Sequence, residues 1–491
     1  MSRLKRNLPI YLGPLAFILL EILGKPESMS IEAFHVLSAT VWIAIWWVTE
    51  AVPIAVTALL PIILFPLTGA LPLDETTVSY GHKYIFLYLG GFMIAIAIER
   101  WDLHKRIALN IINIIGSNVS MIILGFMVAT AFLSMWISNT ATSVMMLPIG
   151  MAIVAQFKET THDKDFSQVV GKALMLAIAY SASIGGVATL IGTPPNLVLA
   201  GILEEIYGYE LTFVTWMKFG LPVSLVLLAI CWVYLTRFSF KLKNKSLPGG
   251  KSEIKNMLRS LGKITYEEKA VLVIFTLTAL AWISRSLLST FIPSLDDTII
   301  AMSAGILLFV VPAKGKKRKL ITWKEAVKMP WGIILLFGGG MALAKGFTAT
   351  GLAEWIATQM SRLDGLSIIL LILVLVALVN FLTEITSNLA TTAMILPILA
   401  PLCLSFNVHP LVIMVGVTVA ASCAFMLPVA TPPNAVVFGS GYLRIPDMVR
   451  TGISMNILSI ILITLATYLL LPLLWQIDPS VFPDIFKTAN S

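Results

Sequence analysis

The sequence predicts an all-α polytopic membrane protein, with about eleven transmembrane helices plus two re-entrant hairpins in an inverted-topology repeat. Of the 491 residues, 58% are hydrophobic and only 12% are charged, and the mean hydropathy is +0.90. A soluble chain of this length could not bury so much apolar surface. Apolar runs of about 17 to 25 residues recur, and each is long enough to cross ~30 Å of hydrocarbon.

A short polar motif occurs twice at a fixed spacing. Ser138-Asn139-Thr140 lies in an apolar stretch, and Ser387-Asn388-Leu389 follows it by 249 residues. The same offset pairs further polar and small residues, namely Ser134 with Thr383 and Gly90-Gly91 with Gly339-Gly340. We interpret the chain as two structural repeats, each of which places a polar tip in an apolar setting. The predicted segments are a first transmembrane helix (1–30), repeat 1 (31–237), a basic cytoplasmic linker (238–269), repeat 2 (270–475) and a C-terminal tail (476–491).

Repeat 1 begins with apolar spans after the first span at 8–24. They cover about 33–49, 54–72 and 84–100, with a polar loop at 73–83 between the last two. The stretch 105–115 has apolar residues at helical spacing beside Lys105 and Arg106, which is typical of an amphipathic helix in the membrane interface.

The hairpin predicted at 119–156 has two apolar arms around the Ser-Asn tip. No charged residue and no Gly/Pro turn lies near the tip, so a water-exposed loop is a poor fit. A re-entrant hairpin fits better, because irregular backbone at membrane depth is tolerated only around a cavity or inside protein. The next helix, from about 173, breaks at Gly192-Thr193-Pro194-Pro195-Asn196, since neither proline can donate a backbone hydrogen bond. A further span covers 213–236.

Repeat 2 repeats this order after the hydrophilic stretch at 237–269, which includes Pro248-Gly249-Gly250. Spans at 270–290 and 298–312 precede the Gly338-Gly339-Gly340 helix, a hairpin at 366–402 and a helix from Pro410 that breaks at Ala430-Thr431-Pro432-Pro433-Asn434. The last span is 452–474. An odd number of crossings separates equivalent spans, so the repeats are inverted. Basic residues gather at 237–269 and 313–328, which predicts a cytoplasmic N-terminus and an outside C-terminus.

The two tips and two breaks suit anion binding by neutral groups. Half-helix N-termini direct unpaired N–H groups at a cavity, and Ser, Thr and Asn side chains add donors. Carbonyls at Gly192 and Ala430, with Ser134, Asn139, Thr383 and Asn388, offer hard neutral oxygens for a small cation. Cation-coupled anion uptake is therefore predicted. The alternative is that these residues only hold helices together.

Two acids lie near or within apolar segments. Glu50 and Glu384 could belong to a proton or cation relay, or could be hydrogen-bonded carboxyls at helix ends.

The remaining composition argues against a nucleic-acid-binding protein and against an enzyme. The net charge of +8 comes from loop residues and indicates orientation rather than nucleic-acid binding. The five histidines and three cysteines form no metal-ligand spacing, and catalytic motifs are absent, so the chain is not predicted to be an enzyme.

The paired motifs give the chain its resemblance to a known family. Together with the two Thr-Pro-Pro-Asn breaks, Trp47-Val48-Thr49-Glu50-Ala51-Val52-Pro53 and the stretch 421–434, they resemble the divalent anion/sodium symporter (DASS) family of INDY-type di- and tricarboxylate transporters. The likeness covers essentially the whole chain. It implies a plasma (inner) membrane homodimer, surrounded by lipid, whose transport domain moves by an elevator mechanism.

The resemblance also implies the site residues. Two Na⁺ ions, the coupling ions, would be held by Ser134, Ser138, Asn139 and Gly192, and by Thr383, Ser387, Asn388 and Ala430. A dicarboxylate would contact Ser138, Asn139, Thr140, Thr193, Ser387, Asn388 and Thr431. Leu389 departs from the family pattern, in which many members carry Thr, so one hydroxyl contact is missing.

The predicted function is Na⁺-driven import of C4- or C5-dicarboxylates such as succinate, malate, fumarate or 2-oxoglutarate. Two alternatives stay open within the family, a Na⁺-independent dicarboxylate exchanger and a carrier of sulfate or a related oxyanion.

Overall fold

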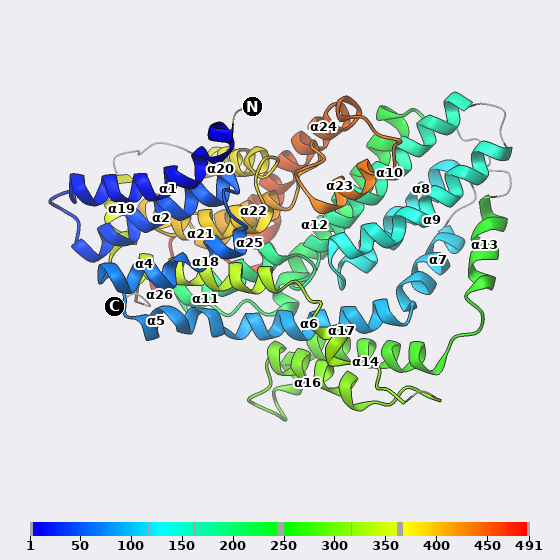
Figure 1. Cartoon of the computed structure of the whole chain (residues 1–491), viewed down its shortest axis with the longest axis horizontal. Coiled ribbons are helices and arrows are strands. Elements are labelled where there is room, and N and C mark those ends of the chain that lie inside the picture. Colours follow the sequence, from blue (N-terminus) through cyan, green and yellow to red (C-terminus); the bar gives the residue numbers. More distant parts are fainter. Residues whose placement is uncertain are drawn as a thin grey trace.

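The computed structural model describes residues 3–115, 118–160, 164–242, 250–315, 317–360 and 367–488, and these ranges contain helices but no β-strand (Figure 1). Eight of the described helices are long and apolar enough to cross a membrane, and six shorter apolar helices accompany them. The predicted all-α polytopic membrane fold is therefore confirmed.

The first half of the chain contains α1 to α12. Their bounds are α1 Arg3–Leu23, α2 Ile31–Thr49, α3 Ile54–Thr57, α4 Leu60–Thr68, α5 Leu73–Val78, η1 Ser79–Gly81, α6 Lys83–Arg100, α7 Leu103–Ile115, α8 Val119–Ser134, α9 Asn139–Thr160, α10 Lys164–Val187, α11 Pro194–Tyr207, α12 Phe213–Val233 and η2 Tyr234–Ser239. The polar loop predicted at 73–83 is wrong, because α5 and η1 occupy it. Asp74 and Glu75 lie in the first turn of α5, where acidic side chains favour a helix N-terminus.

The second half contains α13 to α26. Their bounds are α13 Gly250–Ser260, α14 Tyr266–Ile283, α15 Arg285–Leu288, α16 Asp297–Val310, α17 Trp323–Ala326, α18 Trp331–Ala349, α19 Leu352–Met360, α20 Ile368–Leu382, α21 Asn388–Ser405, α22 Pro410–Ala421, α23 Pro432–Phe438, α24 Ile445–Leu465, η3 Ala466–Leu470, α25 Leu471–Trp475 and α26 Asp484–Thr488.

The hydrophilic stretch between the repeats contains a helix. α13 packs on α7 and α9, with Ile254 fully buried. Arg106 of α7 hydrogen-bonds the carbonyls of Leu261 and Gly262 and forms a 2.8 Å ion pair with Glu268 at the start of α14. The described part of this stretch is therefore tied to repeat 1. Pro248 and Gly249 lie outside the described residues.

The two hairpins occupy opposite ends of the molecule. In Figure 1, α8 and α9 lie towards the right-hand end with α13, whereas α20 and α21 lie towards the left-hand end with α19. The amphipathic helix predicted at 105–115 is present as α7 and packs along α8. Each hairpin packs against a broken helix, α8 and α9 against α10, and α20 and α21 against α22.

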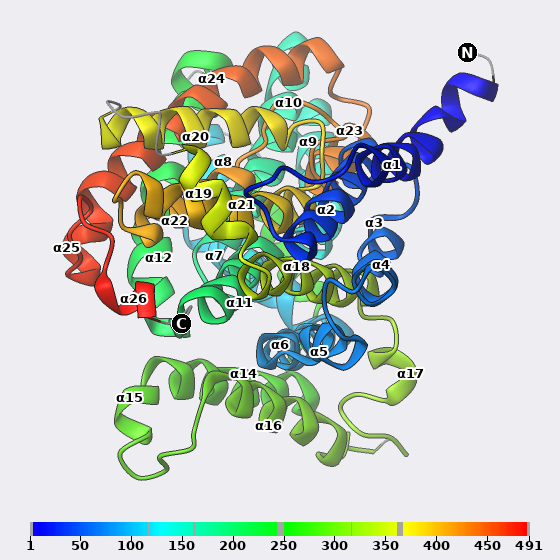
Figure 2. The ribbon, with the colours of Figure 1, turned by 90° about the vertical axis from the view of Figure 1, so that its left-hand side faces the viewer.

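The paired glycines make equivalent contacts in the two repeats. A methyl group at Gly90 of α6 would lie 2.5 Å from the carbonyl carbon of Ala301 in α16. A methyl group at Gly339 of α18 would lie 2.5 Å from the carbonyl oxygen of Ala58, directly after α3. The helices that contain these glycines, α6 of repeat 1 and α18 of repeat 2, thus each pack directly against the other repeat. Figure 2 shows the resulting layer of α14 and α16 beside α5 and α6.

Substitution of Gly90 by Ala is expected to destabilise the protein by about 1–3 kcal/mol, because overpacking against backbone cannot be relieved by side-chain rotation. Thermal unfolding in detergent measures the effect. Gly81→Ala is the matched control, since nothing lies within 4 Å of a methyl group there. Equal unfolding temperatures for the two variants would contradict this packing.

Candidate functional site

Four helices begin at one cavity of about 630 Å³. α9 and α21 start at the hairpin tips, and α11 and α23 start at the proline breaks. The cavity lining includes all seven residues predicted to touch substrate, which are Ser138, Asn139, Thr140, Thr193, Ser387, Asn388 and Thr431. The N-termini of α9 and α21 direct partial positive charge and free N–H groups at this space. The dipoles of α11 and α23 point there too, but the first two residues of each are prolines and have no N–H. Dipoles from both repeats therefore converge on one space.

Among the residues that the structure describes, none of those lining the cavity is Lys, Arg or His. Its one formally charged side chain is Glu50, which ends α2 in a left-handed conformation with φ of 47°. Tyr88 and Ser183 add hydroxyl groups, and Ile54, Ile333 and Val429 add apolar surface. An anion in this cavity would be held by neutral dipoles, as helix N-termini allow.

A cluster of three oxygens lies behind the first tip. The Ser134 hydroxyl lies 2.6 Å from Asn139 Oδ1 and 2.7 Å from the carbonyl oxygen of Ala182. Ser134 is fully buried. A hydroxyl has a single proton, so it cannot donate to both acceptors at once. This cluster, which we call cluster 1, therefore has more acceptors than donors.

The second repeat reproduces this cluster. The Thr383 hydroxyl lies 2.6 Å from Asn388 Oδ1 and 3.0 Å from the carbonyl oxygen of Ala421. Thr383 is also fully buried. We call this cluster 2. Excess neutral oxygen acceptors are what a small hard cation requires, so both clusters fit Na⁺ in their chemistry. The predicted carbonyl ligands, Gly192 and Ala430, line the cavity beside them.

Glycines allow the first break to reach the first tip. A methyl group at Gly186, near the end of α10, would lie 2.5 Å from Asn139 Oδ1. One at Gly192 would lie 2.5 Å from the carbonyl oxygen of Gly186. One at Gly185 would meet the backbone of Ala131 in α8 at 2.3 Å. Close approach between α8, the tip and the break thus depends on residues without a side chain.

An asparagine after each proline pair satisfies the broken backbone. Asn196 Nδ2 donates to the carbonyl oxygens of Gly186 at 3.2 Å and Thr189 at 2.8 Å. Asn434 Nδ2 donates to those of Ala424 at 3.3 Å and Leu427 at 3.0 Å. Both asparagines are fully buried. They link the loop to the half-helix that follows it, because each bonds carbonyls that no longer have a helical partner.

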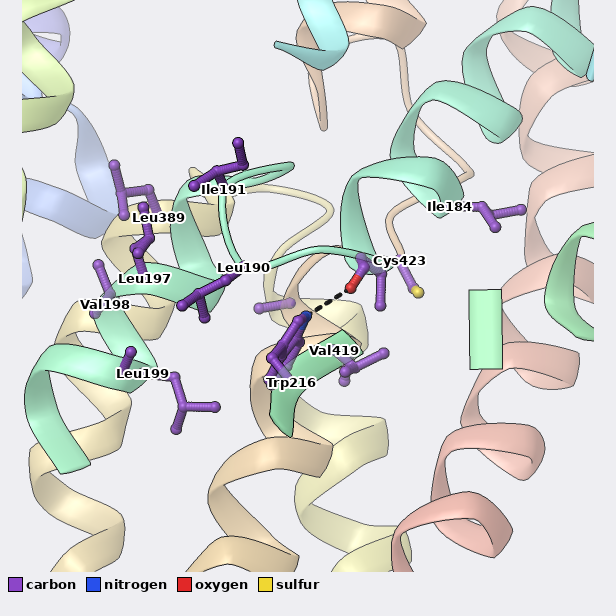
Figure 3. Close-up of a cluster of buried hydrophobic side chains, with 14 of the residues drawn as sticks. Ile184, Leu190, Ile191, Leu197, Val198, Leu199, Trp216, Leu389, Val419 and Cys423 are labelled. Carbon is purple, nitrogen blue, oxygen red and sulfur yellow. Dashed lines mark hydrogen bonds between the residues drawn. The ribbon is translucent and has the colours of Figure 1, made fainter. Parts of the chain in front are cut away.

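The buried Trp216 side chain stabilises the first break by a hydrogen bond and by apolar packing. The Trp216 indole of α12 donates to the carbonyl oxygen of Val187, the last residue of α10, at 2.9 Å. Figure 3 shows Trp216 with Leu190 and Ile191 of the break, Val419 of α22 and Cys423 of the second break, all of them buried. The two breaks thus share one core.

Sequence reasoning missed several residues of this site. Tyr88 gave no signal beyond its apolar helix, and Gly186 resembled an ordinary packing glycine. Asn196 and Asn434 were visible at the end of both break motifs, and their repetition could have indicated the loop-bonding role. The predicted residues Ser134 and Thr383 do not line the cavity and lie behind it.

A membrane-embedded cavity formed by two hairpin tips and two broken helices defines the chain as a membrane transporter and not an enzyme. The chain belongs to the family described as "Sodium:sulfate symporter transmembrane region", which matches residues 5–476. This is the divalent anion/sodium symporter family that the motifs predicted.

Known relatives are similar over almost the whole chain. It is 48% identical over 477 residues to the "Sodium-dependent dicarboxylate transporter SdcS" of Staphylococcus saprophyticus, covering 96% of this chain and 92% of the relative. Identity and coverage are the same for the protein of that name from Staphylococcus aureus strain USA300. The solved structure of Neisseria gonorrhoeae MtrF shares the fold, with a TM-score of 0.57 at 12% identity over 92% of this chain and 98% of that one.

Substitution of Gly186 by Ala is expected to displace the Asn139 amide and to abolish stabilisation of the protein by its ligands. Thermal unfolding with and without Na⁺ and succinate measures this loss. Gly332→Ala is the matched control, because its methyl group would have only an ordinary 3.4 Å contact with Ala55. Retention of full ligand stabilisation by the Gly186 variant would show that the close approach is dispensable.

Proposed function

We propose that this protein imports C4- or C5-dicarboxylates, such as succinate, malate, fumarate or 2-oxoglutarate, together with Na⁺. The observation that carries the proposal is the cavity at which both Ser-Asn tips and both proline breaks meet, with no cationic side chain among the described residues that line it. A dianion in such a cavity gains from cations bound beside it. The relatives named for sodium-dependent dicarboxylate transport support the same substrate and ion.

We propose the roles that the family resemblance implies, and the positions of the residues at and behind the cavity support them. Ser138, Asn139, Thr140, Thr193, Ser387, Asn388 and Thr431 contact the dicarboxylate. One Na⁺ is held by Ser134, Ser138, Asn139 and the Gly192 carbonyl, and the other by Thr383, Ser387, Asn388 and the Ala430 carbonyl. Na⁺ supplies positive charge beside the carboxylates. Each Asn serves both ligands, because its Nδ2 can donate to a carboxylate while its Oδ1 faces the cation.

The proposal includes how the protein sits in the membrane and how it moves. We infer a plasma-membrane homodimer in lipid, with the N-terminus cytoplasmic and the C-terminus outside. With this orientation two lining residues lie on the cytoplasmic side, Glu50 directly after α2 and Ile333 in the first turn of α18, so the cavity faces the cytoplasm. The hairpins and broken helices pack on one another, whereas α6, α14 and α16 pack together beside them. This division suits an elevator movement of the hairpin unit.

Substitution of Asn139 or Asn388 by Ala is expected to abolish succinate uptake into proteoliposomes while the protein still folds. Each change removes an amide that lines the cavity and also the acceptor of its cluster. Asn110→Ala is the matched control, since Asn110 is exposed on α7 and its amide donates to the Arg106 carbonyl of the same helix. Undiminished succinate uptake by both variants would rule out the proposed binding site.

One uptake experiment separates symport from its alternatives. Succinate uptake is measured in Na⁺ or in choline, with and without dicarboxylate inside the liposomes. Na⁺ symport predicts uptake that requires Na⁺ and no internal dicarboxylate, whereas an exchanger requires the internal dicarboxylate. Competition by sulfate stronger than that by malate would instead favour an oxyanion carrier.

Substitution of Leu389 by Thr is expected to improve binding of citrate relative to succinate by about 2- to 12-fold, the value of one hydrogen bond of ~0.5–1.5 kcal/mol. Leu389 lines the cavity next to Asn388, and its side chain lies beside Leu197 and Val198 in the buried apolar cluster (Figure 3). The new hydroxyl reaches the substrate in the rotamer that turns it towards the cavity. Competition constants for the two acids in the uptake assay measure the change. Leu389→Val serves as control, because it alters the volume without adding a donor.

A further inference from the structure

A buried carboxylate holds the second break and contributes to no ion pair among the described residues. Glu384 follows Thr383 of cluster 2 and is 3% exposed. Its Oε1 accepts from the backbone N–H groups of Phe425 at 2.8 Å and Met426 at 2.9 Å, and its Oε2 accepts from that of Leu427 at 3.0 Å. Asn456 Nδ2 donates to Oε1 at 2.7 Å. Four donors surround this carboxylate, which is the partner set of an ionised group.

The first repeat has no counterpart to this charge. Met135 lies 249 residues before Glu384, at the equivalent position. The break of repeat 1 has six residues, 188–193, and the Thr189 hydroxyl donates to the Met135 carbonyl. The break of repeat 2 has ten residues, 422–431, and three of its N–H groups bond the carboxylate. The clusters therefore share the same neutral oxygens but differ by one nearby negative charge.

An uncompensated charge inside a protein is costly, and a cation close to it removes much of that cost. Thr383 and Glu384 are consecutive residues, with Cα atoms ~3.8 Å apart. A cation at cluster 2 would thus lie within about 12 Å of the carboxylate, where an effective dielectric constant of about 20 gives an attraction on the order of tenfold in affinity. Cluster 1 receives no such contribution from Met135.

We propose that Glu384 is a positioning residue that also supplies the negative charge of cluster 2. The two cation clusters are consequently inequivalent, and the one in repeat 2 binds Na⁺ more tightly. This inference rests on the proposed Na⁺-coupled transport and adds which site fills first. It also implies that a charged side chain orders the second break, whereas neutral side chains order the first.

The test is Na⁺ binding by the purified protein without dicarboxylate. Thermal unfolding is followed as NaCl replaces choline chloride at constant ionic strength, because a ligand of the folded state raises the unfolding temperature. Glu384→Gln is expected to raise the half-saturating Na⁺ concentration about tenfold. Ser134→Ala is expected to leave the tighter Na⁺ response intact, since it alters only cluster 1. Glu354→Gln, an exposed acid of α19, is the matched control.

A transport readout separates charge from mere structural support. In Glu384→Gln proteoliposomes the Na⁺ concentration for half-maximal succinate uptake is expected to rise about tenfold, and saturating Na⁺ is expected to restore a succinate KM within about twofold of the parent value. A purely structural role would lower maximal uptake and leave the Na⁺ dependence unchanged. Asn456→Ala keeps the carboxylate and removes one donor, so its Na⁺ dependence is expected to stay near that of the parent.

The outcomes are decisive in each case. A folded Gln variant with the parent Na⁺ response overturns the inference. If the Gln variant does not fold, Glu384→Asp decides, since it retains the charge and is expected to bind Na⁺ within about threefold of the parent. A folded Asp variant that binds Na⁺ tenfold more weakly overturns the inference. If the parent itself shows no Na⁺ response in binding or uptake, the proposed function fails instead.

Discussion

The fold depends on bonding the backbone groups that have no helical partner at the two helix breaks. Inside a membrane no water reaches such groups, so each must be bonded within the fold or face a cavity. Asn196 and Asn434 bond the freed carbonyls, Trp216 bonds the end of α10, and Glu384 bonds three N–H groups of the second break. The hairpin tips and the breaks also line the cavity, where their backbone groups are accessible to a ligand.

The repeats share geometry more closely than chemistry. Both hairpin tips present the same hydroxyl–amide pair at 2.6 Å, although one hydroxyl belongs to Ser134 and the other to Thr383. The breaks behind them differ in length and in what orders them, because a carboxylate replaces a methionine. Equivalent positions therefore keep the hydroxyl–amide contact at each tip, while the residues that order the two breaks differ.

The sequence allowed the spans, both hairpins and both breaks to be predicted, because the apolar length and a repeated polar register identify them. It also allowed the residues that line the cavity to be selected, since Ser, Asn and Thr stand out in apolar surroundings. The helix at 73–78 was missed because it has only six residues. The helix α13 was missed because its many charged residues indicated a linker, although its apolar residues recur at helical spacing. A hydrogen-bonded carboxyl was one of the two roles predicted for Glu384. Its partners could not be predicted, since Phe425 to Leu427 and Asn456 lie 41 to 72 residues away.

The reciprocal packing of glycine helices has a consequence for biogenesis. α6 meets α16 through Gly90, and α18 meets the region after α3 through Gly339, so neither half contains its own partner surface. During synthesis the first half enters the bilayer with an unfilled face that only the later half can cover. The halves therefore mature as one unit, and gene fragments encoding them separately should have to be co-expressed before either escapes proteolytic quality control.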